Sequence, residues 1–314
     1  MLGRTANGLF WMFRYLERAE NTARLLEAAL RMALTRDLVT AEAEWRSVIA
    51  TLGLTEAYRA AHDGYDGVAV WNFVLRGSGN PGNVRAMFGA VRANARAARI
   101  NISSDVWEAV NENWMRIDRL LARPVGQGAV GEVLAAIRRA GTQVHGAFDG
   151  SILRDEGYHF SRAGTFIERA DSSARILDMK YFLLLPSLSY VGSSLDTGQW
   201  EQVLRSVAGA RAYSWLNAGQ IEARGIVEFV VLDERFPRSL AFCRSALRGC
   251  LGALARAHGG EGRAVALSRE ADTRISNLTV DQIFEQGLHE FLVDFLARNN
   301  AIAQAIAEDY RFRA

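Results

Sequence analysis

The chain has 314 residues, of which 49% are hydrophobic and 23% are charged, a balance typical of soluble globular proteins. Its formal net charge is only +2, and its basic residues form no contiguous block or basic helix face, which argues against nucleic acid as a partner. No apolar run reaches the about 18 residues that a membrane span needs, so the sequence predicts no membrane segment.

The sequence also favours a reducing compartment without metal chemistry. Arg14, Glu17 and Arg18 interrupt the N-terminal region before a signal-peptide core could form, which predicts a cytoplasmic location. Cys243 and Cys250 are expected to be small buried residues on one face of a helix. Because no Cys/His metal pattern, Gly-rich phosphate loop or Ser/His/Asp arrangement is found, we expect no metal and no cofactor.

Four prolines in 314 residues, with long stretches free of glycine and proline, predict an all-α protein with long helices. Pro81 suits the first turn of one helix, and Thr279 with Gln282 forms a capping-box pattern before the last. In chain order, helices are expected at about 7–35, 40–61, 82–99, 103–121, 132–145, 155–184, 200–215, 221–232, 237–257 and 279–311.

One segment of thirteen residues occurs twice in the chain. Residues 15–27, Tyr-Leu-Glu-Arg-Ala-Glu-Asn-Thr-Ala-Arg-Leu-Leu-Glu, return at 166–178 as Phe-Ile-Glu-Arg-Ala-Asp-Ser-Ser-Ala-Arg-Ile-Leu-Asp, with six of the thirteen positions identical. The match continues in the same order with a slowly drifting offset, which unrelated helices would not keep. We therefore predict two tandem helical-bundle repeats, 1–147 and 152–314, packed together and related by a pseudo-twofold axis. The equivalent pairs are Glu17 with Glu168, Trp45 with Trp200, Tyr58 with Tyr213 and Pro81 with Pro237.

Each copy of the repeated segment is predicted to be a helix with one apolar and one polar face. At about 100° per residue, an apolar stripe forms one face and is assigned to the core. Because Gly164 has no side chain one turn before Glu168, a neighbouring helix or a ligand could come close there. The polar face holds Glu17, Asn21 and Arg24 in the first copy, with Arg14, Arg18 and Glu20 at its edges, and Glu168, Ser172 and Arg175 in the second.

Two interpretations of this polar face stay open. In one, Glu17 and Glu168 belong to a mutually satisfied charged network where two long helices cross, as buried charges require. Arg24 and Arg175 supply the positive charges of that network. In the other, the same groups line a central polar cleft, where Arg fixes a carboxylate or phosphate and Glu takes an amine or acts as a base. Both can hold in part, since a network can leave one donor free.

Further motifs give the chain a family resemblance. It contains Leu-Arg-Asp-Glu-Gly-Tyr at 153–158, Phe-Pro-Arg-Ser at 236–239 and Ile-Phe-Glu-Gln-Gly-Leu-His at 283–289. Together with the two Glu-Arg segments, these motifs resemble the bacterial alpha-E domain family over nearly the whole length, which implies an all-helical fold. Phe13 stands where a Gly is usual in the family. Carried over by position, the motif residues are Glu17, Arg18, Glu168 and Arg169.

The resemblance implies a partner more than a reaction. Family members are typically encoded beside, or fused to, a circularly permuted ATP-grasp amide ligase and a transglutaminase-like cysteine peptidase. We therefore expect an auxiliary protein that binds the ligase, or an anionic, peptide-like ligand, through the Glu/Arg centre. The alternative is an enzyme that transfers or hydrolyses an amide-linked group, with Glu17 or Glu168 as base and Arg24 or Arg175 as carboxylate or oxyanion clamp. A small-molecule carrier is a further alternative. The predicted ligand-binding residues are Arg14, Arg18, Asn21, Arg24, Gly164, Arg169, Ser172 and Arg175.

Overall fold

The computed structural model describes residues 1, 3–34, 38–182 and 194–312, and these residues form helices and no strand, which confirms the all-α prediction. No helix in this described part is long and apolar enough to cross a bilayer. The helices up to residue 151 are α1 (Gly3–Ala33), α2 (Leu38–Thr51), α3 (Thr55–Arg59), α4 (Gly67–Arg76), α5 (Val84–Ala97), α6 (Ser104–Leu120) and α7 (Gln127–Ser151). Those after it are α8 (Glu156–Phe182), α9 (Ser194–Ser206), α10 (Ala210–Leu216), α11 (Ala223–Val231), α12 (Leu240–His258), α13 (Arg263–Ser276), α14 (Val280–Gln286) and α15 (Leu288–Asp309).

Several predicted helices are each divided into two shorter ones, and two helices of the structure were not predicted. The expected helix at 200–215 is divided between α9 and α10, because Ala208 adopts a left-handed conformation with φ 57°. The expected last helix is likewise divided between α14 and α15 at Gly287, whose φ of 94° suits glycine. The helices α4 and α13 were not predicted.

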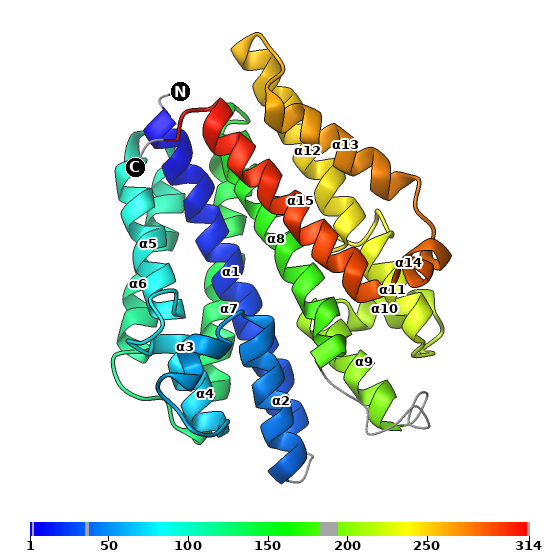
Figure 1. Ribbon diagram of the computed structural model, residues 1–314. Helices are drawn as coiled ribbons and strands as arrows, with labels where there is room; N and C mark the ends of the chain where they lie inside the picture. Colours follow the sequence, from blue (N-terminus) through cyan, green and yellow to red (C-terminus); the bar gives the residue numbers. More distant parts are fainter. Residues whose placement is uncertain (2, 35–37, 183–193, 313–314) are drawn as a thin grey trace.

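Helices α1 and α8 lie side by side at the centre of the molecule and run parallel (Figure 1). Their N-terminal ends meet, since the Met1 ammonium pairs with the Glu156 carboxylate at 2.5 Å. In the first half, α5 and α7 pack on α1, and α6 packs on both; in the second half, α12 and α15 pack on α8, and α13 packs on both. This repeated packing order is what a duplication predicts. The pseudo-twofold axis and the two repeats at 1–147 and 152–314 stay predictions, and α7 continues to Ser151, past the predicted end of the first.

The predicted apolar stripe of α1 is core. Its members Met12, Leu16, Ala19, Ala23 and Leu26 are completely buried, and Leu30, the last of the stripe, is partly buried. The opposite face is buried as well, because α8 covers it, so α1 is enclosed on nearly all sides although one of its faces is polar. Polar groups buried in this way need partners within the protein.

Gly164 explains how α1 and α8 come so close. A Cβ atom at this position would overlap the backbone carbonyl oxygen of Phe10 on α1. The gap foreseen at Gly164 is therefore filled by the neighbouring helix. Phe13, which stands where the family pattern expects a glycine, packs its ring instead against Phe148 of α7, with 4.5 Å between the ring centroids.

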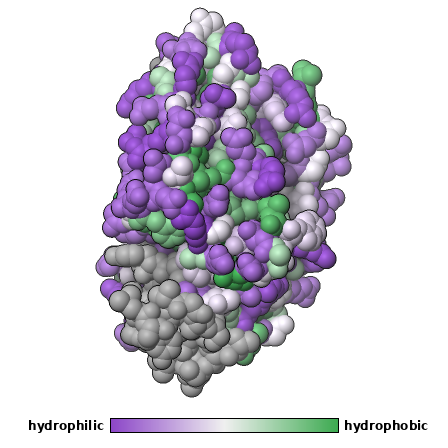
Figure 2. All heavy atoms as spheres, turned by 90° about the vertical axis from the view of Figure 1, so that its right-hand side faces the viewer, coloured by the Kyte–Doolittle hydropathy of each residue, from purple (hydrophilic) through white to green (hydrophobic). Residues whose placement is uncertain are grey.

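The described part of the surface that Figure 2 shows has no single dominant apolar patch. Figure 2 shows that the side of the molecule on the right of Figure 1 is mostly hydrophilic, with apolar side chains in scattered patches. Scattered exposed apolar residues are normal on globular proteins. The charged groups of the two Glu-Arg segments lie instead on the buried polar face between α1 and α8.

Candidate functional site

The two copies of the Glu-Arg pair bind each other across the contact between α1 and α8. Glu168 of α8 accepts hydrogen bonds from Nε and Nη2 of Arg18 on α1, at 2.5 and 2.9 Å. Glu17 of α1 accepts from Nε and Nη2 of Arg169 on α8, at 3.0 and 2.8 Å. Each glutamate thus forms a two-point ion pair with the arginine of the other copy, the geometry in which guanidinium and carboxylate bind best. A twofold relation between the copies would produce this exchange.

Further donors complete the coordination of both carboxylates. Arg14 donates from Nε to Oε2 of Glu168 at 3.0 Å. Arg238, in the turn just before α12, donates from Nη1 to Oε1 of Glu17 at 2.8 Å, and Asn21 donates to the same oxygen at 3.2 Å. Glu17 and Glu168 are 0% and 1% exposed. Both are therefore buried charges with several charged partners each, as the network interpretation requires.

The predicted partners Arg24 and Arg175 are not the ones that bind the motif glutamates, and on this point the sequence-based prediction was wrong. Arg24 binds Glu20 one turn earlier, with 2.6 Å between Nη2 and Oε1. It reaches the network only through Glu20, which also accepts from Arg238 at 2.9 Å. Arg175 binds Asp171 on its own helix at 2.7 Å. Each of these two arginines is paired with a carboxylate four residues before it, a favourable spacing on a helix.

The arginines hold both motif glutamates in the ionised form. Burial raises the pKa of the Glu17 carboxyl, but Arg169 and Arg238 together outweigh burial and keep this pKa well below its usual value. Burial likewise raises the pKa of Glu168, and Arg18 with Arg14 outweighs it. A carboxylate stabilised in this way is a weak base, since a proton must compete with two guanidinium groups. The geometry does not favour either glutamate as a general base.

The network carries more positive than negative charge. Six guanidinium groups oppose four carboxylates, so 6 − 4 leaves an excess of two positive charges. Such an excess favours an anion as the ligand. The guanidinium groups belong to Arg14, Arg18, Arg24, Arg169, Arg175 and Arg238, and the carboxylates to Glu17, Glu20, Glu168 and Asp171.

At one end, the network opens into a cavity of about 410 Å³ between α1, α8 and the end of α2, which we call the central cavity. Its volume lies within the range of small-molecule sites. One part of its wall is apolar and contains Leu25, Leu52, Leu54, Val74, Met87 and Ile176. The other part is polar and contains Arg18, Asn21, Thr22, Thr51, Asn80, Glu168, Asp171, Ser172 and Arg175.

Three groups on the wall of the central cavity have donor capacity left. Arg18 uses Nε and Nη2 on Glu168, which leaves its Nη1. Arg175 uses only Nε on Asp171, which leaves both terminal nitrogens, and 42% of its side chain is exposed. The Thr51 hydroxyl is buried and has no hydrogen-bond partner among the described residues. A buried hydroxyl without a partner is costly, so a ligand or water is expected to bind it.

Five of the ten predicted site residues line this cavity, and the others do not. Glu17, Arg14 and Arg169 lie inside the network, Gly164 lies at the helix contact, and Arg24 lies at the far end of the network. The residues of the prediction that line the cavity are Arg18, Asn21, Glu168, Ser172 and Arg175. Their role as ligand contacts stays a prediction.

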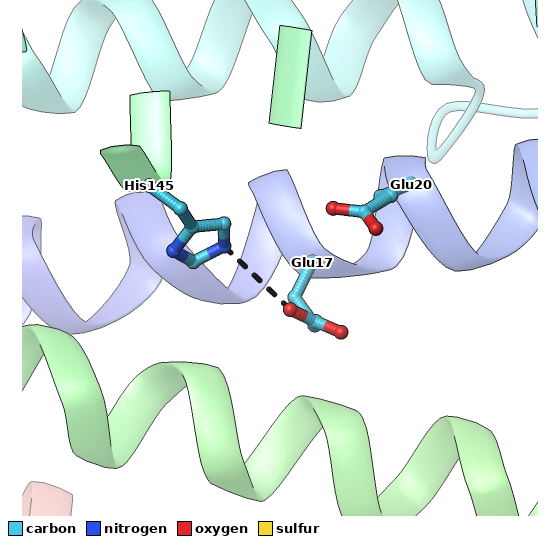
Figure 3. Close-up of side chains that lie close together, drawn as sticks. All are labelled: Glu17, Glu20 and His145. Atoms are coloured by element: carbon cyan, nitrogen blue, oxygen red, sulfur yellow. Dashed lines mark ion pairs between the residues drawn. The ribbon is translucent and has the colours of Figure 1, made fainter. Parts of the chain in front are cut away.

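Sequence reasoning missed His145, Arg238 and Thr51, and it placed Glu20 only at the edge of the polar face. Arg238 lies within the Phe-Pro-Arg-Ser motif at 236–239, which was the one available signal for it. Within the described part of the chain, Glu17, Glu20 and His145 form the one group whose ligand atoms lie close enough for a metal, within 4.8 Å of one another (Figure 3). Both glutamates, however, already accept hydrogen bonds from arginines, and a cation would have to displace them against an excess of positive charge. This geometry disfavours a metal.

Comparisons with known proteins agree with the fold and leave the activity open. A family model named Alpha-E, described as a predicted alpha-helical domain with a conserved ER motif, matches residues 1–310. An uncharacterised protein of Mycobacterium bovis is 26% identical over 97% of this chain, and two uncharacterised proteins of Mycobacterium tuberculosis strains are 26% and 25% identical over the same share. The match covers 36% of each relative, so the chain spans about a third of their length. No solved structure matches the chain.

Proposed function

The chain belongs to the Alpha-E family, and we propose that it is a non-catalytic protein that binds a carboxylate-bearing, peptide-like ligand in the central cavity. The observation that carries this proposal is the unused donor capacity of Arg18 and Arg175 on the wall of a cavity of about 410 Å³. Guanidinium groups held by carboxylates on one side are well placed to bind a carboxylate on the other.

The polar and the apolar parts of the cavity wall match the C-terminal residue of a peptide. A terminal carboxylate would bind at Arg18 and Arg175, and the hydroxyl of Thr51 would take a hydrogen bond from the ligand or donate one. The apolar wall, which includes Leu54 and Met87, suits an aliphatic side chain. A ligand with a carboxylate and a short apolar body therefore uses both parts of the cavity.

Binding is favoured over the enzymatic alternative by the state of the glutamates. Glu17 and Glu168 are ionised and enclosed by arginines, so neither is suited to take a proton from a nucleophile. The clamp candidates of that alternative, Arg24 and Arg175, bind Glu20 and Asp171 rather than the glutamates that would act as base. The same groups serve better as a fixed frame for recognition.

The partners in this proposal are a circularly permuted ATP-grasp amide ligase and a transglutaminase-like peptidase, which the family resemblance implies. About two thirds of each mycobacterial relative lies outside the part that matches this chain, and this supports a domain that works together with others. The ligand would be a substrate or product of amide-bond formation held by the helical protein.

Calorimetric titration with the dipeptide alanyl-leucine and with its C-terminal amide tests the ligand. We expect saturable binding of the free dipeptide, with the amide and the Arg175→Gln variant each weaker by about tenfold, the effect of one charge-assisted hydrogen bond. Arg119→Gln, which removes an exposed arginine outside the cavity, should change nothing. Equal binding of dipeptide and amide would contradict the proposal.

Co-purification with the ATP-grasp ligase at low salt tests the partner separately. A complex is expected to survive gel filtration, and the purified chain alone should not turn over amide substrates. Elution of the chain without the ligase would refute the proposed partner and would leave the result on ligand binding unaffected.

A further inference from the structure

A second hollow lies on the other side of α1 and is strongly basic. This cleft has a volume of about 200 Å³, lies between α1, α7 and the junction of α9 with α10, and shares no lining residue with the central cavity. We call it the arginine cleft. Its lining contains one acidic residue, Glu27, and five arginines, namely Arg24, Arg31, Arg138, Arg205 and Arg211.

The carboxylates near the arginine cleft do not balance these arginines. Glu27 accepts from Arg31 at 2.8 Å and pairs with Arg138 at 3.0 Å, so one carboxylate serves two guanidinium groups. Arg24 binds Glu20, which Arg238 shares, and Arg205 lies 3.6 Å from Glu201. The cleft thus has five guanidinium groups, and the described carboxylates that pair with them are three, those of Glu20, Glu27 and Glu201. The difference, 5 − 3, is an excess of two positive charges.

Arg211 is the clearest free donor of the set. Its side chain is exposed, and its guanidinium lies over the ring of Trp215 at 5.8 Å from the centroid, a contact that uses no N–H group. The left-handed turn at Ala208, between α9 and α10, brings Arg205 and Arg211 to the same cleft. Arg138, by contrast, is held by Glu27, with 3.0 Å between its Nε and the carboxylate oxygen.

The chemistry of the walls selects a small and highly charged ligand. The remaining lining residues are the alanines Ala28, Ala208 and Ala210, which offer little apolar surface. The volume is below that of sites for drug-sized molecules, so the cleft suits an anionic group rather than a large organic ligand. Planar guanidinium forks bind phosphate oxygens in pairs, and two or more negative charges would match the excess.

We propose that the arginine cleft binds an oligophosphate group, either free pyrophosphate or the phosphate chain of a nucleotide. This site is separate from the central cavity and does not depend on the proposed peptide ligand. The two are linked through Arg24, which lines the cleft and binds Glu20 of the buried network. Arg24 is therefore left unchanged in the test, so that the network stays intact.

The test titrates pyrophosphate, ATP and adenosine into the intact chain at low and at high salt. The variant Arg205→Gln/Arg211→Gln removes two exposed guanidinium groups from the cleft, and Arg116→Gln/Arg119→Gln removes the same charge from an exposed face of α6. We expect saturable binding of pyrophosphate. The cleft variant should lower the affinity by about 100-fold, tenfold for each guanidinium, and the α6 variant should change the affinity by no more than about twofold.

The ligands then identify the source of the phosphate. ATP that binds more tightly than pyrophosphate would indicate a nucleotide, and equal affinities would indicate the phosphate group alone; adenosine should not bind. Absence of saturable binding, or an equal loss in the α6 variant, would overturn the proposal, as would an acidic peptide that binds more tightly than pyrophosphate. Should the double variant melt early, Arg211→Gln alone is expected to lose about tenfold.

Discussion

Replacing Glu17 by glutamine should strongly destabilise the folded protein. Glu17 is completely buried and accepts four hydrogen bonds, two from Arg169 and one each from Arg238 and Asn21. Glu17→Gln keeps the volume but removes the charge, so Arg169 loses its only two-point partner while its side chain is 13% exposed. Leaving a buried charge unpaired costs about 3–5 kcal/mol. This is a large share of the about 5–15 kcal/mol by which proteins of this kind are stable.

Urea unfolding followed by far-ultraviolet circular dichroism measures this loss as a lower midpoint. The matched control is Glu308→Gln, which breaks a pair of similar length with Arg263 whose two side chains are each 63% exposed. Exposed pairs contribute at most about 1 kcal/mol, so this control should hardly change the midpoint. A double-mutant cycle with Arg169→Gln should show coupling, because the double variant removes both charges. If Glu17→Gln and Glu308→Gln lowered the urea midpoint equally, the buried network would not be the interaction that holds α1 to α8.

Three further predictions concern the helix contact, pH and a second buried charge. Gly164→Ala should lower the free energy of unfolding by about 1–3 kcal/mol, because the added Cβ would overlap α1. The control Gly249→Ala, whose Cβ meets nothing within 4 Å, should raise it by up to about 1 kcal/mol. Equal urea midpoints of the two variants would contradict the close helix contact. Because the pKa of Glu168 is lowered in the folded state, its contribution is present above the unfolded value near 4.5 and is lost as the pH falls through the folded pKa, so the urea midpoint should drop steeply below about pH 4. Arg244 is buried, and its three guanidinium nitrogens have no hydrogen-bond partner among the described residues. Arg244→Met should therefore leave the free energy of unfolding, measured from the urea midpoint, unchanged or raise it. A decrease in this free energy of more than about 2 kcal/mol would disprove the reasoning.

Local signals in the sequence predicted local structure well. The capping box at Thr279 and Gln282 is present with both of its hydrogen bonds, and the apolar stripe of α1 is buried. Glycine and proline marked many helix ends, but Ala208 could not be foreseen as a break, because only tertiary contacts keep an alanine in a left-handed conformation. The sequence thus indicated the helices better than the interruptions within them.

The partners of the motif glutamates could not be predicted from periodicity. A helical projection places Arg18 about 100° from Glu17, at the edge of the polar face, and it was Arg24 that fell near the centre. The projection carries no information about the angle at which α8 crosses α1, and this crossing brings the edge residues Arg18 and Arg169 opposite Glu168 and Glu17. A duplicated Glu-Arg pair on two parallel helices nevertheless permits this reciprocal pairing.

Sites formed by distant segments were still less accessible to sequence reasoning. Arg238 reaches Glu17 from 221 residues away, and the central cavity combines residues from the end of α2, from α4 and from α5 with those of α1 and α8. Nothing in the spacing of these residues indicates their proximity. The arginine cleft was likewise invisible, because its five arginines come from four helices.

The network and ligand-binding interpretations of the Glu/Arg face are compatible, because they concern different parts of it. A network that only joined two helices would need equal numbers of positive and negative groups, since every additional buried guanidinium costs desolvation free energy. Here three arginines of the network stand at its borders, with Arg18 and Arg175 on the central cavity and Arg24 on the arginine cleft. Their carboxylate partners fix the orientation of each guanidinium, so an incoming anion would have less conformational entropy to remove. In the proposed binding role, the satisfied interior would be a rigid support for the arginines at its ends. That role would explain why a charged contact is retained where apolar packing would be at least as stable.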